Sequence, residues 1–249
     1  MPFVTEIFQL MSTPFRHAAY FAPALQSQAW DLGSQWLGRC AHQMTPLQQP
    51  QFDNLSSEVF EKLTRAPRLY GWHATLKAPF ELNSNAKLEE LPPAFRQLAH
   101  NTVSAFHLPL KLVEMGDFLA LVPSHPSPDL QKFAEHCVRQ LHALALPLSE
   151  TELQRRTGAG LTARQTALLH AWAYPFVMDQ FQFHLTLSGS LQNVESHVKK
   201  NLKAAAQEWF APLLEHGLDI DAVTWFSQDQ KNGDFRWVES FELSTSNCA

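Results

Sequence analysis

Short stretches of this chain alternate between hydrophobic and polar residues, and longer stretches carry hydrophobic residues three or four positions apart. Alternation is typical of a strand with one buried face, and the wider spacing is typical of a helix. The alternation predicts strands at 16–21, about 70–82, 108–114, 117–122, 181–191, 222–227 and 235–243. The wider spacing predicts helices that begin near Ser27, Glu58, Pro92, Pro128, Thr162 and Asn193. Residues 41–57 and 145–160 follow neither pattern, and we expect them to be loops.

The order of the predicted elements is similar in the two halves of the chain. Each half has a helix, a strand rich in aromatic residues, a second helix and then a hairpin. Antiparallel strands with helices on one face are typical of an α+β fold. We therefore expect one bilobal domain over residues 1–249, with lobes at about 14–124 and 125–249. A pseudo-twofold axis would relate the lobes, with helices on their outer faces and a cleft between them.

One short motif occurs twice, once in each half. Its two copies are YGWHATL at residues 70–76 and FQFHLTL at residues 181–187. Both copies read aromatic, any residue, aromatic, His, apolar, Thr and Leu. Residues two apart in a strand share a face, so each copy should place its histidine beside its threonine. The four residues concerned are His73, Thr75, His184 and Thr186.

Paired histidines and hydroxyls suit the chemistry of a phosphodiester. Histidine titrates near neutrality and is the usual general acid or base. One neutral imidazole can activate water or a hydroxyl on one side of phosphorus, while a protonated imidazole donates to the departing oxygen on the other. The hydroxyls of Thr75 and Thr186 can donate to the non-bridging oxygens. This scheme needs no metal or other cofactor, and it does not say which histidine is the base.

Charge and cysteine content limit the classes of partner and the cellular compartment that we expect. The chain has 24 acidic and 19 basic residues and a net charge of -5, which argues against a long nucleic-acid partner but not against a small phosphate ester. Three cysteines lie far apart, as expected of reduced thiols in a cytoplasm. Neither a leader sequence nor an apolar run of about 20 residues is evident. We expect a cytoplasmic monomer without membrane contact.

The two motif copies resemble the paired His-x-Thr motifs of the two-histidine (2H) phosphoesterase superfamily. Further strings resemble its phosphonate-metabolism branch, which is found in bacterial phosphonate-utilisation operons. These strings are RHAAYFAP at 16–23, GWHATLKAPF at 71–80, LTARQ at 161–165 and YPFVM at 174–178. The resemblance covers nearly the whole chain from about residue 14. It implies a bilobal α+β fold with a cleft, and catalysis by His73 and His184 with Thr75 and Thr186 binding the substrate.

Other residues are candidates with two readings each. Alternation places Lys77 on the face of Thr75, where it could neutralise a phosphate, but it could also leave the sheet at a strand end. Tyr20 could line the cleft from a neighbouring strand or be a half-buried core residue. Three arginines could reach a second phosphate or belong to a solvated loop; they are Arg155, Arg156 and Arg164. Tyr174 could stack on a sugar or be a packing residue. The other ten histidines form no metal-binding pattern.

Three hypotheses follow for function. The first is a metal-independent phosphoesterase acting on a small cyclic phosphodiester, for which the operon context of the branch suggests ribose 1,2-cyclic phosphate. The second is processing of RNA ends with 2′,3′-cyclic phosphates, which the acidic balance disfavours. The third is a protein that binds a phosphorylated metabolite without turnover. Paired proton-transfer groups favour an enzyme over a binding protein.

Overall fold

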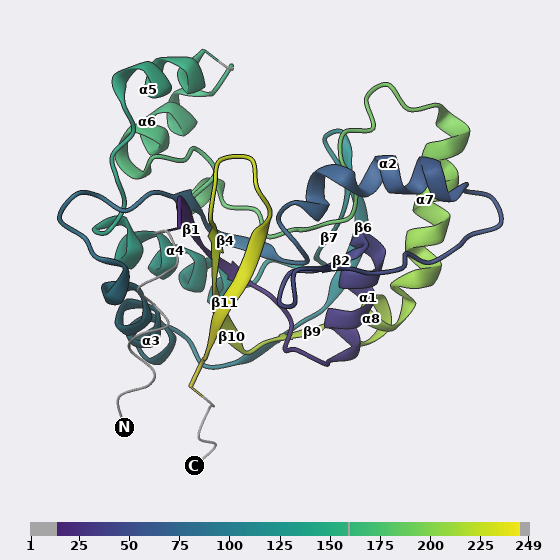
Figure 1. Ribbon diagram of the computed structural model, residues 1–249, viewed down its shortest axis with the longest axis horizontal. Coiled ribbons are helices and arrows are strands. Elements are labelled where there is room, and N and C mark those ends of the chain that lie inside the picture. The colour runs from purple at the N-terminus through teal and green to yellow at the C-terminus, as the bar shows by residue number, and fades with distance from the viewer. Residues whose placement is uncertain (1–13, 159, 245–249) are drawn as a thin grey trace.

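A seven-stranded antiparallel sheet forms the centre of the molecule (Figure 1). The computed structural model describes residues 14–158 and 160–244. Across the sheet the strands follow in the order β11 (Phe235–Glu242), β10 (Ala222–Gln228), β1 (Arg16–Phe21), β4 (Ala74–Phe80), β8 (Leu185–Thr186), β7 (Phe118–Pro123) and β6 (Leu110–Met115). Two small ladders pair β2 (Arg39–Cys40) with β3 (Thr45–Pro46) and β5 (Phe106–Leu108) with β9 (Leu218–Ile220). The α+β class with antiparallel strands is therefore confirmed.

The sheet mixes strands from the two halves of the chain. The β10–β11 hairpin, from the second half, pairs with β1, while the β6–β7 hairpin, from the first half, pairs with β8. The two motif strands, β4 and β8, meet in the middle through one pair, Ala74 opposite Leu185. The two halves of the chain thus exchange their hairpins within one sheet.

Separate groups of helices cover the two ends of the sheet (Figure 1). Helices α3 (Leu91–Asn101) and α4 (Pro128–His142) pack against β10, β11 and β4. On the β8–β6 side lie α1 (Gln28–Leu37), α2 (Ser57–Arg68), α7 (Ser196–Trp209) and α8 (Ala211–His216). There Trp36 is fully buried against Phe60 and Phe210, and its indole donates to the carbonyl of Leu187 at 2.8 Å. This contact anchors α1 directly behind the second motif.

Local signals placed several helix ends correctly. The Ser27 hydroxyl accepts from the amide of Trp30 at the start of α1, and Gly38 closes that helix with a φ of 75°. Thr162 and Gln165 form the predicted capping box at the start of α6 (Ala163–Trp172). Pro92 lies in the first turn of α3, after the short 3₁₀ turn η2 (Leu88–Glu90).

Other boundaries predicted from the sequence are wrong. Residues 145–160 are not all irregular, because Ser149 caps a short helix, α5 (Glu150–Thr157). Helix α7 begins at Ser196 with Glu195 as its N-cap residue, instead of being capped by Asn193. Helix α2 continues to Arg68, two residues before the predicted start of the first motif strand at about 70, so that strand begins later.

Both motif strands are shorter than predicted. Tyr70 and Gly71 belong to the turn that closes α2, where Gly71 has a φ of 78°, so β4 begins only at Ala74. Strand β8 has two residues instead of the predicted 181–191. Just after it, the Ser188 hydroxyl accepts from the amide of Leu119 on the neighbouring strand. Each motif histidine therefore lies immediately before a strand, not within one.

Candidate active site

The pairing of β4 with β8 brings the two copies of the motif together. Ala74 lies opposite Leu185 in an antiparallel register. When this register is continued by one residue in each direction, His73 lies opposite Thr186 and His184 lies opposite Thr75. All four side chains line one cavity of about 640 Å³; they are His73, Thr75, His184 and Thr186.

The two imidazoles are held in the same way. Nδ1 of His73 lies 2.9 Å from the carbonyl oxygen of Gly71, and Nδ1 of His184 lies 2.8 Å from that of Gln182. A carbonyl oxygen only accepts hydrogen bonds, so each Nδ1 carries the hydrogen. In the neutral imidazoles Nε2 is then the basic nitrogen. Each histidine thus has a fixed tautomer suited to proton transfer through Nε2.

Burial favours the neutral form of both histidines. It lowers the pKa of His73 to about 4, against a smaller opposing effect of the Gly71 carbonyl and with help from the charges of His184 and Arg39. Burial also lowers the pKa of His184, and the Gln182 carbonyl opposes it. The Thr75 hydroxyl lies 3.3 Å from Nε2 of His73 and can donate to it in the neutral state.

Tyr20 supports His73 from the neighbouring strand. It lies opposite Thr75 on β1, and its ring stacks on the His73 imidazole with 3.8 Å between centroids and 26° between planes. The side chain lines the cavity but is only 1% exposed, and burial raises its pKa well above the ordinary value. Tyr20 is therefore a fully buried core residue, and not the half-buried one of the second reading, and its side chain borders the cavity.

Lys77 does not line this cavity, and its predicted placement beside Thr75 is wrong. On β1, Tyr20 pairs with Thr75 but the adjacent Ala19 pairs with Lys77, so β4 carries an extra residue at this point. Beyond such a bulge, residues of β4 point to the opposite face of the sheet from the one that strict alternation predicts. The ammonium of Lys77 lies 5.0 Å from the Phe80 ring centroid on the other side of the sheet, where burial lowers its pKa to about 8.

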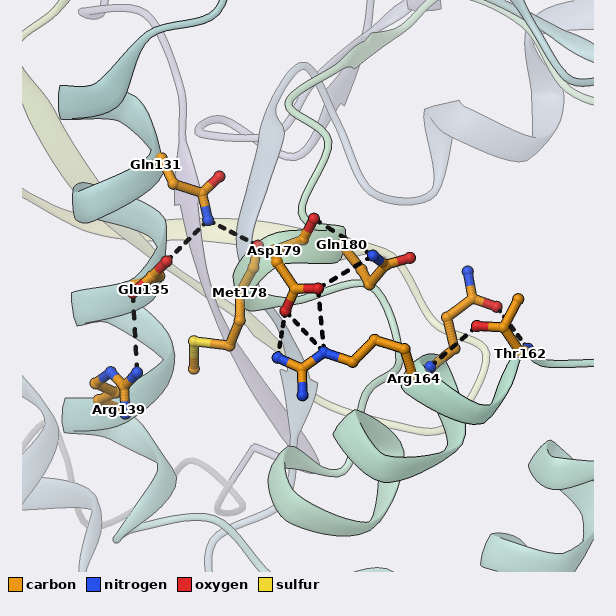
Figure 2. A network of polar contacts seen from close by, with 9 residues as sticks. Gln131, Glu135, Arg139, Thr162, Arg164, Met178, Asp179 and Gln180 are labelled. Atoms are coloured by element: carbon orange, nitrogen blue, oxygen red, sulfur yellow. Dashed lines mark hydrogen bonds and ion pairs between the residues drawn. The ribbon is translucent and has the colours of Figure 1, made fainter.

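The three arginines singled out from the sequence have different surroundings. Arg156 lines the cavity, as does Tyr174. Arg155 lies outside it and binds Glu152 with a side chain that is 70% exposed. Arg164 also lies outside, and Figure 2 shows its guanidinium paired with Asp179 where α6 approaches the short turn η3 (Met178–Gln180).

Sequence reasoning missed three polar residues of the cavity. Arg16 lines it from the start of β1, four residues before Tyr20 and on the same face of that strand. Ser188 and Ser190 line it just after the second motif. The spacing of Arg16 from Tyr20 was a usable signal, since both lie on one predicted strand at an even separation.

Within 14–158 and 160–244, no group of three or more His, Cys, Asp or Glu side chains is arranged to hold a metal ion. Over the same ranges, no helix has the length and apolar character needed to cross a bilayer.

Comparison with curated proteins gives relatives that are longer than this chain. Two proteins named ribose 1,5-bisphosphate phosphokinase PhnN are each 36% identical to it. The one from Janthinobacterium sp. (strain Marseille) aligns over 210 residues, 84% of this chain and 46% of the relative. The one from Laribacter hongkongensis (strain HLHK9) aligns over 221 residues, 89% and 50%. The chain thus spans about half the length of the curated relatives it matches.

This chain is also similar to solved structures and to one family model. E. coli LigT complexed with NADP+ is similar over 94% of this chain and 100% of that one, with a TM-score of 0.43 and 12% identity. A structure described as a phosphoesterase matches over the same shares with a TM-score of 0.42 and 12% identity. The family model described as "Protein of unknown function (DUF1045)" matches residues 75–236, more than half of the chain. The chain therefore belongs to the DUF1045 family.

Proposed function

We propose that this protein is a phosphoesterase that opens a small cyclic phosphodiester. The observation that carries the proposal is the pair of imidazoles in one cavity, each with Nδ1 bound to a backbone carbonyl. A cyclic phosphodiester needs a proton removed from the attacking water and a proton given to the departing oxygen. Two histidines on either side of phosphorus satisfy both needs.

His73 is assigned as the general base and His184 as the general acid. The Thr75 hydroxyl can donate to Nε2 of His73 only while that nitrogen is unprotonated. Burial also lowers the pKa of His73 to about 4, which favours its unprotonated form, and the proton of the pair is therefore assigned to His184. His73 takes a proton from water, the water oxygen bonds to phosphorus, and one ester P–O bond breaks. His184 gives its proton to the departing oxygen, and exchange with solvent restores both groups.

The threonines stabilise the charge that develops on phosphorus. Thr75 and Thr186 line the cavity on either side of the β4–β8 pair. Their hydroxyls can donate to the non-bridging oxygens, where negative charge is concentrated in the transition state. Because Thr75 must leave Nε2 of His73 to do this, substrate binding frees that nitrogen for its role as base.

The names of the relatives favour a sugar phosphate as the substrate. Both curated relatives are named for ribose 1,5-bisphosphate. Within the proposed reaction class, a ribose cyclic phosphate formed during phosphonate breakdown is the matching compound. The net charge of -5 fits a small substrate better than a long nucleic acid.

The test is phosphorus NMR of purified protein with ribose 1,2-cyclic phosphate and with nucleoside 2′,3′-cyclic phosphates. His73→Ala and His184→Ala should each lower kcat by about 10²–10⁴-fold. His197→Ala is the matched control, because that imidazole is 69% exposed on α7 and lies outside the cavity. Losses below tenfold in both cavity variants would refute the proposed roles. Ligand-dependent melting shifts without turnover would favour a binding protein instead.

A further inference from the structure

The charges of the histidine cavity exceed what one cyclic phosphodiester requires. Arg16 and Arg156 both line the cavity, whereas no Asp or Glu does among the described residues that line it. This is unusual in a chain whose net charge is -5. A cyclic phosphodiester carries a single negative charge. Two guanidinium groups in a cavity without a carboxylate indicate a ligand with additional negative charge.

Arg16 is held in place without an acidic partner. Its Nε donates to the side-chain carbonyl of Gln228 at 2.8 Å, and its guanidinium lies 5.4 Å from the centroid of the Phe235 ring. Over residues 14–158 and 160–244, no carboxylate lies within ion-pair distance of it. These contacts fix the direction of the side chain and leave its two terminal nitrogens available.

Arg156 reaches the same cavity from α5. Its Nε donates to Glu152 at 2.6 Å, and Nη1 donates to the carbonyl of Ala173 at 3.1 Å. Glu152 is also bound by Arg155 through two further hydrogen bonds, so this one carboxylate is shared between two guanidinium groups. A guanidinium has five N–H donors, and Arg156 therefore keeps donors for a ligand.

A second cavity of about 620 Å³ adjoins the first at these two arginines. Both cavities are lined by Arg16, Ala78, Pro79, Arg156 and Tyr174. The other charged residues that line the second cavity are Lys77, Lys231, Glu81 and Glu152. Counting the two arginines, four cations face two carboxylates there. The junction of the two cavities thus has space and positive charge for a ligand group in addition to the one at the histidines.

We propose that the substrate carries a second anionic group, a phosphomonoester, which binds between Arg16 and Arg156 while the cyclic phosphate lies at the two histidines. This inference rests on the proposed function, because it assigns the cyclic ester to the histidines. It names the substrate class more narrowly: a phosphorylated sugar cyclic phosphate with its two phosphorus groups at opposite ends. Arg16 and Arg156 are the residues that select it.

The test compares ribose 1,2-cyclic phosphate with the same compound carrying a 5-phosphate. Wild type should have the higher kcat/KM for the doubly charged compound by tenfold or more, since hydrogen bonds to charged groups contribute about that much. Arg16→Gln and Arg156→Gln should each reduce this preference by about tenfold. Arg155→Gln is the matched control, because it removes the same charge from the adjacent position of the same helix but lies outside both cavities. Equal kcat/KM for the two compounds in wild type would overturn the proposal.

Equilibrium binding separates this inference from the proposed function. Calorimetry with ribose 1,5-bisphosphate and with ribose 1-phosphate, which lacks the 5-phosphate, requires no turnover. Tighter binding of the bisphosphate by wild type, lost in Arg156→Gln but kept in Arg155→Gln, would support the second subsite even if neither cyclic compound were cleaved. Turnover of both cyclic compounds at the same rate, together with equal affinities for the two sugar phosphates, would refute the second subsite. The proposed phosphoesterase activity would then still be supported.

Discussion

His73 is expected to stay neutral at a pH where an ordinary histidine is mostly charged. Burial is the largest cause, and it lowers the pKa from 6.5 to about 4. The proton affinity of the imidazole is then about 300-fold below the ordinary value. At pH 5.5 an ordinary imidazole is about 90% protonated, whereas His73 should be about 3% protonated.

Tyr20 is the side chain whose removal should test this reasoning. Its ring covers one face of the His73 imidazole at 3.8 Å between centroids. Tyr20→Ala would admit water to that face and weaken the desolvation that lowers the pKa. The pKa of His73 should therefore rise from about 4 toward 6.5 in the variant. His184 makes no ring contact with Tyr20, so its pKa should move less and serves as the internal control.

The assay is nitrogen-15 NMR of imidazole-labelled protein across the acidic range. The chain has 12 histidines, so His73→Gln and His184→Gln variants are needed to assign the two signals. Both should show the hydrogen on Nδ1, because each Nδ1 faces a backbone carbonyl. Two results would refute the reasoning: a wild-type His73 that titrates near 6.5, or a Tyr20→Ala variant in which its pKa is unchanged.

Three further perturbations test other parts of the structure. Gly33→Ala would place a methyl group 2.0 Å from the Trp72 ring, so urea unfolding should show a loss of about 1–3 kcal/mol, and unchanged stability would contradict this packing. Burial lowers the pKa of His17 to about 4, so its contribution to stability is present above pH 6.5 and is lost as the pH falls toward 4. His17→Gln should reduce the slope of unfolding free energy against pH in that window, and an unchanged slope would count against it. Activity should survive a chelator, since the proposed mechanism draws both proton transfers from histidine; strong inhibition would point to a metal.

The sequence was informative where a feature depends on neighbouring residues. The caps of α1 and α6 each depend on residues within one helical turn, and both were predicted correctly. The motif copies were recognisable because each repeats its spacing within seven residues. The α+β class follows from the order of such local patterns.

Features that depend on a distant strand were not readable from the sequence. The position of Lys77 depends on a bulge, which appears only in the pairing of β4 with β1. The hydrogen bond just after β8, from the amide of Leu119 to the Ser188 hydroxyl, joins residues 69 positions apart. Neither residue is unusual in its own stretch, so no periodicity could signal either event.

The exchange of hairpins explains how two similar local sequences form one site. Strand β8 has only two residues, and its neighbours are β4 on one side and β7 on the other. The β7 partner comes from the first half of the chain, and the amide of Leu187 binds the carbonyl of Leu119 at 2.8 Å. A hairpin that precedes the second motif in sequence therefore holds that motif beside the first. Because Ala74 faces Leu185, each histidine lies opposite the other copy's threonine, and one long-range pair brings both halves of the proposed site together.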